Sequence, residues 1–196
     1  MVQQPPHPCP RLQGEGETFD VANQLKMPDL RPTPLRAGKD ALEFTAMTMH
    51  VFETELFLPV PRAKVFPFFA DARNLEILTP PWLNFHVLTP GDIQMGVGTL
   101  IDYQLRIHGL PVRWQSEITV WEPPFRFADE QRRGPYRRWN HTHTFEEKDG
   151  GTLCRDRVLY AVPGGALVNW IFVRHDVAKI FRYRSAALKE YFGVKG

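Results

Sequence analysis

From residue 84 to residue 162 apolar and polar side chains alternate, and turn-forming residues interrupt the alternation at five places. A period of two is typical of strands with one buried face, and short turns join antiparallel neighbours. The turn signals are Pro90-Gly91, His108-Gly109, Pro123-Pro124, Gly134-Pro135 and Asp149-Gly150-Gly151. They separate six predicted strands near 84–89, 98–108, 111–122, 125–132, 136–147 and 151–162. The sequence therefore predicts an antiparallel sheet of sequential neighbours.

Further elements flank this segment. Residues 50–58 alternate as a strand, and two prolines follow it. Residues 62–70 form a short apolar helix, and Asp71 can cap a second one. Residues 165–193 repeat apolar side chains at helical spacing. That stripe contains Leu167, Ile171, Ala178, Phe181, Leu188 and Phe192, and Trp170, Val177, Ile180 and Tyr191 widen it.

A single sheet and one long helix bury both apolar faces when the sheet curls around the helix. We therefore predict an α+β fold in which a curved antiparallel sheet of about seven strands wraps around the C-terminal helix, with two short helices after the first strand. A curved sheet and one helix rarely fill the space between them, so a cavity is expected.

Residues 1–48 differ from the rest, because they are rich in proline and show no sustained period. Such a segment cannot bury enough apolar surface to offset its ordering entropy. We predict a disordered or loosely ordered extension at 1–48 and a ligand-binding domain at 49–196. Met47 and Met49 precede the first strand, so a second interpretation is that translation begins at one of them.

The charge and the cysteine content limit the classes of partner and the cellular location that the sequence favours. A formal net charge of +2 gives no electrostatic reason to expect a nucleic-acid partner. Cys9 and Cys154 form neither a disulfide framework nor a metal-type spacing, which favours a cytoplasmic location. No apolar run approaches the roughly 20 residues that span a bilayer, and no signal pattern opens the chain. A basic turn could still contact a membrane surface or a partner transiently through Arg132, Arg133, Arg137 and Arg138.

The strand pair in residues 125–145 indicates where a site lies. Trp139, His141, His143 and Phe145 share one face, because successive side chains of a strand point to opposite sides. Polar groups on an apolar face are costly unless they are paired or used. The neighbouring strand places Asp129 and Gln131 on the face of Phe125 and Phe127, within reach of the imidazoles.

Three interpretations of His141 and His143 follow, each with Asp129 or Asp156 as partner. The favoured one is a hydrogen-bonded polar wall of a ligand cavity. The others are a metal site, with a carboxylate as third ligand, and an acid–base pair for ring closure or dehydration. No nucleophile motif is present, and the glycines of residues 91–98 lie between strands, not in a phosphate-binding loop. We predict no metal and no cofactor, with His141, His143, Asp129 and Asp156 as catalytic candidates.

Other residues complete the predicted ligand-binding set. Tyr103 and Trp114 lie on adjacent strands, where they pack or line an apolar pocket. Trp82 follows the short helices and could cover the cavity mouth. Arg174 and Arg184 on the last helix either reach solvent along their stems or pair with a carboxylate or ligand anion. The set is Tyr103, Trp114, Phe127, Asp129, Gln131, Trp139, His141, His143 and Arg174.

Several short motifs carry a family resemblance over about residues 49–193. They are Asn74-Leu75, Leu78-Thr79-Pro80-Pro81, Gly98 with Ile101-Asp102-Tyr103, Gly109-Leu110-Pro111 with Trp114, and Gly134-Pro135-Tyr136 with Trp139, His141 and His143; Gly151-Thr152, Asp156, Tyr160 and Pro163 also fit. With the order of elements, they resemble a bacterial ligand-binding subgroup of the SRPBCC superfamily, which includes START, Bet v 1 and polyketide cyclase/dehydrase-like domains. The resemblance implies a helix-grip fold. Some relatives are fused to a sugar-epimerase-like dehydrogenase domain, so the resemblance also implies such an enzyme as a partner.

Three functions are compatible with these features. The leading hypothesis is a module that binds a lipid, isoprenoid or polyketide-like molecule in the cavity. The second is a cyclase or dehydratase that uses a His-Asp pair. The third is a partner-binding module whose cavity is filled by side chains and whose basic turn contacts the partner.

Overall fold

A computed structural model describes residues 47–194. The predicted extension falls almost wholly outside the described residues, as does Cys9, so the division at residue 48 stays a prediction. The elements are β1 (His50–Leu58), α2 (Arg62–Phe69), the 3₁₀ turn η2 (Ala72–Asn74), α3 (Leu75–Leu78), the 3₁₀ turn η3 (Pro81–Leu83), β2 (His86–Val87), β3 (Leu100–Ile107), β4 (Leu110–Glu122), β5 (Arg126–Arg133), β6 (Arg138–Lys148), β7 (Gly151–Ala161), α4 (Gly165–Val168), the π-helical turn η4 (Asn169–Val173) and α5 (Arg174–Tyr191). In this part of the chain, no helix is both long enough and apolar enough to cross a membrane.

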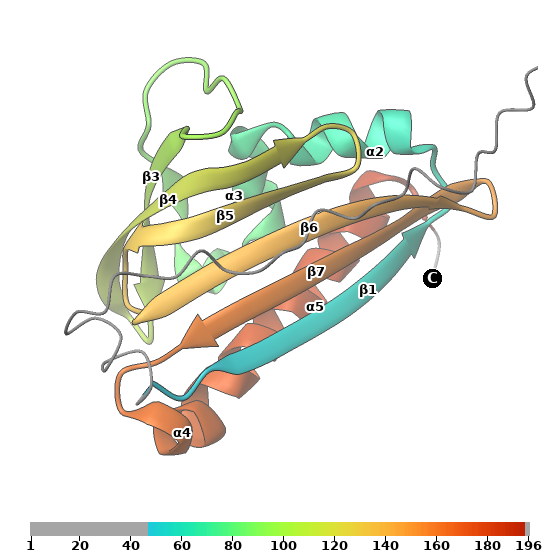
Figure 1. The fold of residues 1–196 in the computed structure, drawn as a ribbon. Coiled ribbons are helices and arrows are strands. Elements are labelled where there is room, and N and C mark those ends of the chain that lie inside the picture. The colour runs from blue at the N-terminus through green and yellow to red at the C-terminus, as the bar shows by residue number, and fades with distance from the viewer. Residues whose placement is uncertain (1–46, 195–196) are drawn as a thin grey trace, which may run out of the picture. The chain divides into compact units, whose positions relative to one another are not determined.

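The seven strands form one antiparallel sheet in the order β1-β7-β6-β5-β4-β3-β2 (Figure 1). Sequential strands are neighbours from β2 to β7, as the turn signals predicted, and β1 closes the order by pairing with β7. The strand predicted near 84–89 is shorter than expected, because only His86 and Val87 pair with β3. The predicted antiparallel sheet is confirmed.

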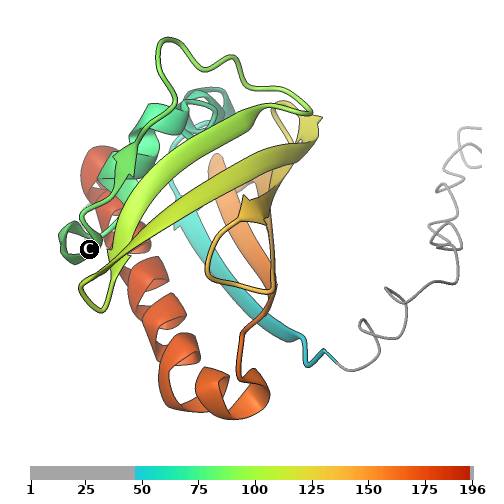
Figure 2. The same cartoon turned by 90° about the vertical axis from the view of Figure 1, so that its left-hand side faces the viewer.

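The sheet curls around α5, which lies across its concave side (Figure 2). The register between β4 and β5 shifts between Gln115 and Ser116 and again between Ile118 and Val120. A bulge adds a residue to one strand, bends it and increases its twist. These irregularities lie in the middle of the sheet, where the strands fold over the helix. The helix-grip arrangement is confirmed.

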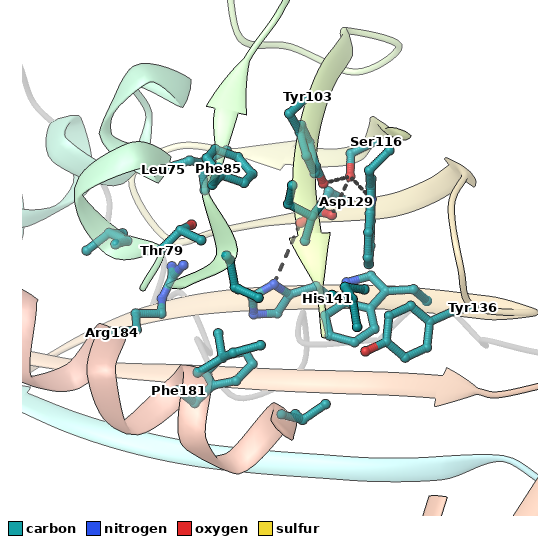
Figure 3. Close-up of a pocket in the computed structure, with 18 of the residues that line it drawn as sticks. Leu75, Thr79, Phe85, Tyr103, Ser116, Asp129, Tyr136, His141, Phe181 and Arg184 are labelled. Atoms are coloured by element: carbon teal, nitrogen blue, oxygen red, sulfur yellow. Dashed lines mark hydrogen bonds and ion pairs between the residues drawn. The ribbon is translucent and has the colours of Figure 1, made fainter. Parts of the chain in front are cut away.

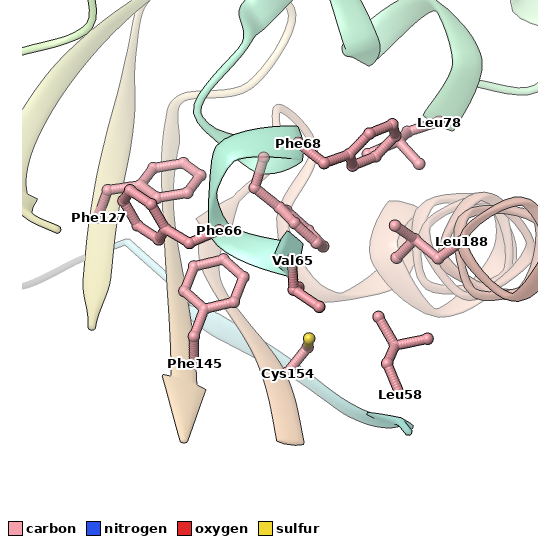
Figure 4. Close-up of a cluster of buried hydrophobic side chains, with 10 residues drawn as sticks. Leu58, Val65, Phe66, Phe68, Leu78, Phe127, Phe145, Cys154 and Leu188 are labelled. Atoms are coloured by element: carbon pink, nitrogen blue, oxygen red, sulfur yellow. The ribbon is translucent and has the colours of Figure 1, made fainter. Parts of the chain in front are cut away.

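The largest apolar cluster lies at the end of the domain where α2 packs on the sheet (Figure 4). Helix α2 buries four side chains, Val65, Phe66, Phe68 and Phe69. Their partners come from six other elements and are Leu58, Leu78, Phe127, Phe145, Cys154 and Leu188. The ring of Phe66 meets Phe145 edge to face at 5.4 Å. This packing fixes one end of α5 and leaves the middle of the concave face open.

The C-terminal helix differs from its predicted apolar stripe. The turn η4 inserts a π-helical step, and a π turn rotates the side chains that precede it relative to those that follow. Leu167, Trp170 and Ile171, predicted on the apolar stripe, are therefore exposed, and Tyr191 at the end of α5 is exposed as well. The buried residues of α5 are Val177, Phe181, Arg184 and Leu188.

Candidate ligand-binding pocket

A pocket of about 890 Å³ lies between the concave face of the sheet and α5 (Figure 3). Its walls come from α2, α3, strands β3 to β6 and the last helix. Apolar side chains make most of the lining, among them Phe69, Ile101, Leu105, Ile118, Trp139 and Phe181. A cavity filled by side chains, which the third functional hypothesis required, is not what the described residues form.

A cross-strand register gathers the polar part of the wall. Asp129 of β5 is paired with His141 of β6, and His143 of β6 is paired with Asp156 of β7. Directly opposed residues on one face lie close enough for their side chains to interact. The sequence pattern predicted this grouping, and the structure brings all four catalytic candidates together.

Asp156 contacts both imidazoles from behind the pocket wall. Its Oδ1 lies 3.0 Å from Nε2 of His141 and 2.7 Å from Nδ1 of His143. The two rings are 3.8 Å apart between centroids and tilted by 45°, so the carboxylate holds them as a close pair. Asp156 does not itself line the pocket. Its position is that of an orienting group, not of a group that meets a ligand.

Asp129 faces the pocket on the other side of the rings. Its Oδ1 is 3.8 Å from Nδ1 of His141 and also 3.8 Å from Nε2 of His143. Its Oδ2 accepts a hydrogen bond from the Ser116 hydroxyl at 3.1 Å. The Tyr103 hydroxyl lies 2.7 Å from Ser116 Oγ and extends this chain of polar contacts (Figure 3). Asp129 is therefore oriented by Ser116 and lacks a close bond to either ring.

Arg184 is a site residue that the sequence analysis did not select. It is 8% exposed, and its Nε lies 3.8 Å from Asp156 Oδ2. Its terminal nitrogen lies 3.5 Å from Nδ1 of His143, and the guanidinium is 5.3 Å from the Phe69 ring centroid. The buried Nε of Arg184 has no hydrogen-bond partner among the described residues. A buried donor without a partner on a pocket wall is a potential contact for a ligand acceptor.

The cluster shifts the acidity of its members. Burial raises the pKa of Asp156, but the Arg184 charge and the two imidazoles outweigh burial and hold that pKa well below its ordinary value. For Asp129, burial is likewise outweighed by His143, His141 and Ser116, so its pKa is lowered. Burial and the neighbouring His143 lower the pKa of His141. At neutral pH the wall therefore holds two carboxylates and a neutral His141.

Tyr103 is buried next to Asp129, and this environment changes the pKa of its hydroxyl group. Desolvation, reinforced by the Asp129 charge, raises the pKa of Tyr103 well above its ordinary value. The phenol stays protonated at neutral pH and can donate a hydrogen bond. This adds one neutral donor to the polar wall.

Seven of the nine predicted ligand-binding residues line the pocket: Tyr103, Trp114, Phe127, Asp129, Trp139, His141 and His143. Gln131 does not, because its amide bridges the β5–β6 turn through the backbone of Tyr136. Arg174 does not either, because it is exposed and stacks over Trp170. Arg174 thus reaches solvent and Arg184 pairs with a carboxylate, which are the two alternatives that the sequence left open for each arginine. Ser116 and Tyr136 line the pocket and were also missed, since neither breaks the strand pattern.

The mouth of the pocket is rich in exposed apolar side chains. Trp82 is half exposed, meets Tyr183 edge to face and lies beneath the Lys179 ammonium. Phe172 lines the pocket and is also 55% exposed. Leu167, Trp170 and Ile171 are exposed on the same stretch of helix. Trp82 is part of the pocket lining, and its role as a cover of the mouth stays a prediction.

Comparison with known proteins identifies the family. A family model described as polyketide cyclase/dehydrase and lipid transport matches residues 58–178. Among curated proteins, no sequence matches this chain. The matched segment contains every pocket-wall strand and the start of α5.

Solved structures show the same fold. Ara h 8.0201 has a TM-score of 0.58 and 19% identity, over 75% of this chain and 99% of its own. Ms6760 from Mycobacterium smegmatis has a TM-score of 0.54 and 19% identity, over 75% and 92%. The ginseng major latex-like protein 151 from Panax ginseng has a TM-score of 0.57 and 10% identity, over 74% and 97%. At these identities the likeness shows the fold alone.

Proposed function

Because the chain belongs to the polyketide cyclase/dehydrase and lipid transport family, within the SRPBCC superfamily, we propose that it binds a hydrophobic or amphipathic small molecule between the sheet and α5. The pocket of about 890 Å³ carries this proposal. Its volume is within the range of ligand sites that enclose most of a small molecule. The ligand class is a lipid, isoprenoid or polyketide-like compound.

The pocket has two chemically different regions, which supports an amphipathic ligand. Phe69, Leu105 and Ile118 would contact the apolar part. The wall around His141, Asp129 and Nε of Arg184, which has no hydrogen-bond partner among the described residues, would contact the polar end. A few placed polar groups in an apolar pocket fix the orientation of a ligand.

The exposed side chains at the mouth support ligand exchange at a membrane surface. Leu167, Trp170, Ile171 and Phe172 are exposed apolar side chains on one stretch of helix, here called the apolar patch, and Phe172 also lines the pocket; Arg174 adds a cation over Trp170. Aromatic and aliphatic side chains with neighbouring cations suit the interface of an anionic bilayer. Contact of this patch with a membrane is part of the proposal.

The proposal is tested by native mass spectrometry of the full chain purified from its own host, followed by denaturing extraction. We expect one bound organic molecule per chain, which extraction releases. Ile180→Trp should fill part of the pocket and remove that mass, whereas Arg182→Trp on the exposed side of α5 should keep it. A bare chain mass, together with no displacement of the fluorescent probe anilinonaphthalene sulfonate by extracted host lipids, would refute ligand binding.

A second candidate function is acid–base chemistry on the bound molecule. The contact of Asp156 with both imidazoles favours it, because a carboxylate that orients an imidazole supports proton transfer. His141 would then act on a ligand in the pocket. His141→Ala should abolish turnover and leave binding in place if this function holds. A sugar-epimerase-like dehydrogenase partner remains a prediction from the family resemblance.

A further inference from the structure

Three potential metal ligands converge on one point of the pocket wall. One ligand atom each of Asp129, His141 and His143 lies within 4.8 Å of the other two, and the ring nitrogens nearest to Asp129 Oδ1 are Nδ1 of His141 and Nε2 of His143. Two of these separations are 3.8 Å, too long for a hydrogen bond. Metal–nitrogen bonds of about 2.0–2.1 Å at a tetrahedral angle put ligand atoms about 3.4 Å apart. Small side-chain rotations would therefore bring the three atoms to bonding distance of a common ion.

The opposite ring nitrogens are held in the arrangement that such a site needs. An ionised carboxylate only accepts, so the nitrogens that face Asp156 at 3.0 and 2.7 Å carry the hydrogens. In that tautomer the other nitrogen of each ring points its lone pair towards Asp129. The Arg184 contact with His143 is longer, at 3.5 Å, so Asp156 is the closer partner of Nδ1. A carboxylate behind a metal-binding imidazole is the usual orienting group.

The facing groups are all acceptors. Two imidazole lone pairs and the Asp129 carboxylate point at one another, an arrangement that favours a cation between them. Arg184 offsets the charge of Asp156, whereas within residues 47–194 Asp129 forms ion pairs with the two imidazoles and with no Lys or Arg side chain. Ser116 occupies the other Asp129 oxygen and leaves Oδ1 free for the ion.

We propose that His141, His143 and Asp129 bind one divalent first-row transition metal ion. Two imidazoles and one carboxylate suit zinc and ferrous iron, and they leave coordination positions open. Because Asp129, His141 and His143 all line the pocket, those positions face the proposed ligand and suit one of its oxygen atoms. From the sequence we predicted no metal, because a hydrogen-bonded polar cavity wall was the favoured interpretation of the two histidines. The metal site rests on side-chain geometry and not on the proposed function.

The test uses the metal alone and the full chain without any organic ligand. Isothermal titration with Zn²⁺ should give one equivalent, and Co²⁺ should give the visible absorption of a low-symmetry site with nitrogen and oxygen ligands. Asp129→Asn, which keeps the side-chain shape, should weaken Zn²⁺ binding at least tenfold. Asp156→Asn should weaken it about 10- to 100-fold, the usual effect of removing an orienting partner.

Two controls separate this site from chance binding. His175→Ala removes an exposed imidazole outside the cluster and should leave affinity unchanged. A variant carrying His7→Ala and Cys9→Ser removes two donor side chains near the N-terminus and should also bind normally. Circular dichroism must show that each variant is folded. No heat and no Co²⁺ spectrum with the wild-type chain, or Zn²⁺ binding that survives both Asp129→Asn and His141→Ala, would overturn the proposal. Either result leaves native mass spectrometry of the organic ligand unaffected.

Discussion

Arg184 and Asp156 carry opposite charges inside the domain, and burial makes each dependent on the other. Arg184 is 8% exposed and Asp156 is 9% exposed. Among the charges that keep the carboxyl pKa of Asp156 low, the guanidinium has the largest effect, ahead of the two imidazoles. Removing one partner of a buried ion pair leaves the other charge buried and unpaired, and this lowers the free energy of unfolding by more than the pair contributes to it.

Arg184→Met should therefore destabilise the domain by about 3–5 kcal/mol, the usual cost of breaking a buried pair. Arg174→Met on the same helix is the matched control, because Arg174 is exposed and lies over Trp170. Its effect should stay within about 0.5 kcal/mol. Urea denaturation followed by circular dichroism measures both. Equal effects would mean that Arg184 reaches solvent as Arg174 does.

Cys154 gives a pH-dependent prediction. Burial and the Asp156 charge raise the pKa of its thiol to about 12, with Arg184 acting in the opposite direction. Since the thiolate is the reactive form, iodoacetamide should label native Cys154 very slowly at pH 8 and faster as pH rises. The folded pKa exceeds the unfolded value of about 8.5, so this group's contribution to stability is full below pH 8.5 and falls above it.

The measurement uses a Cys9→Ser variant, in which Cys154 is the single thiol. Labelling in guanidinium gives the rate of the exposed thiol. We expect native labelling at pH 8 to be at least a hundredfold slower. The stability of the variant should also fall more between pH 8 and pH 10 than that of a Cys154→Val version. Native and denatured rates within a factor of three would contradict the buried position.

At the scale of elements, the two-residue alternation of apolar and polar side chains was sufficient to predict the strands. One face of each strand is buried, and the turns between strands contain glycine or proline. The start of the last helix was predicted wrongly for a physical reason. The π turn at Asn169–Val173 changes the side-chain register, and apolar spacing does not report such a turn. The same limit applies to Arg184, which a helical pattern alone could place in solvent or in the core. Asp129, His141 and His143 were found because a polar residue on an apolar strand face is a local signal.

The junction of β1 and β7 gives an element-scale prediction. A Cβ on Gly151 would lie 2.4 Å from the Leu58 carbonyl oxygen and 2.7 Å from the Phe57 ring. Gly151→Ala must therefore displace backbone, and we expect a loss of about 1–3 kcal/mol. Gly96→Ala is the control, because nothing lies within 4 Å of its Cβ position. Denaturant midpoints compare the two. A neutral Gly151→Ala would show that β1 and β7 can separate at this end.

At the scale of the whole domain, the fold encloses space that its own side chains do not fill. The apolar clusters lie at the α2 end and along the inner face of the sheet, and the pocket of about 890 Å³ lies between them and α5. A molecule that binds only the folded state stabilises it by mass action. Ligand content should therefore decide the melting temperature as much as any single packing contact does.

Removing the bound molecule by extraction and refolding should lower the melting temperature, and adding the extracted lipid should restore it. At a free ligand concentration of 100 times Kd the stabilisation is about 2.7 kcal/mol, which corresponds to about 5–10 °C for a domain of this size. Ile180→Trp occupies part of the pocket, so its melting temperature should no longer respond to lipid, whereas Arg182→Trp should respond as the wild type does. Differential scanning calorimetry measures all three. If the melting temperatures of Ile180→Trp and wild type responded equally to lipid, the ligand would bind outside this pocket. The indole of the variant occupies space only inside the pocket, so it would not affect a molecule that binds elsewhere.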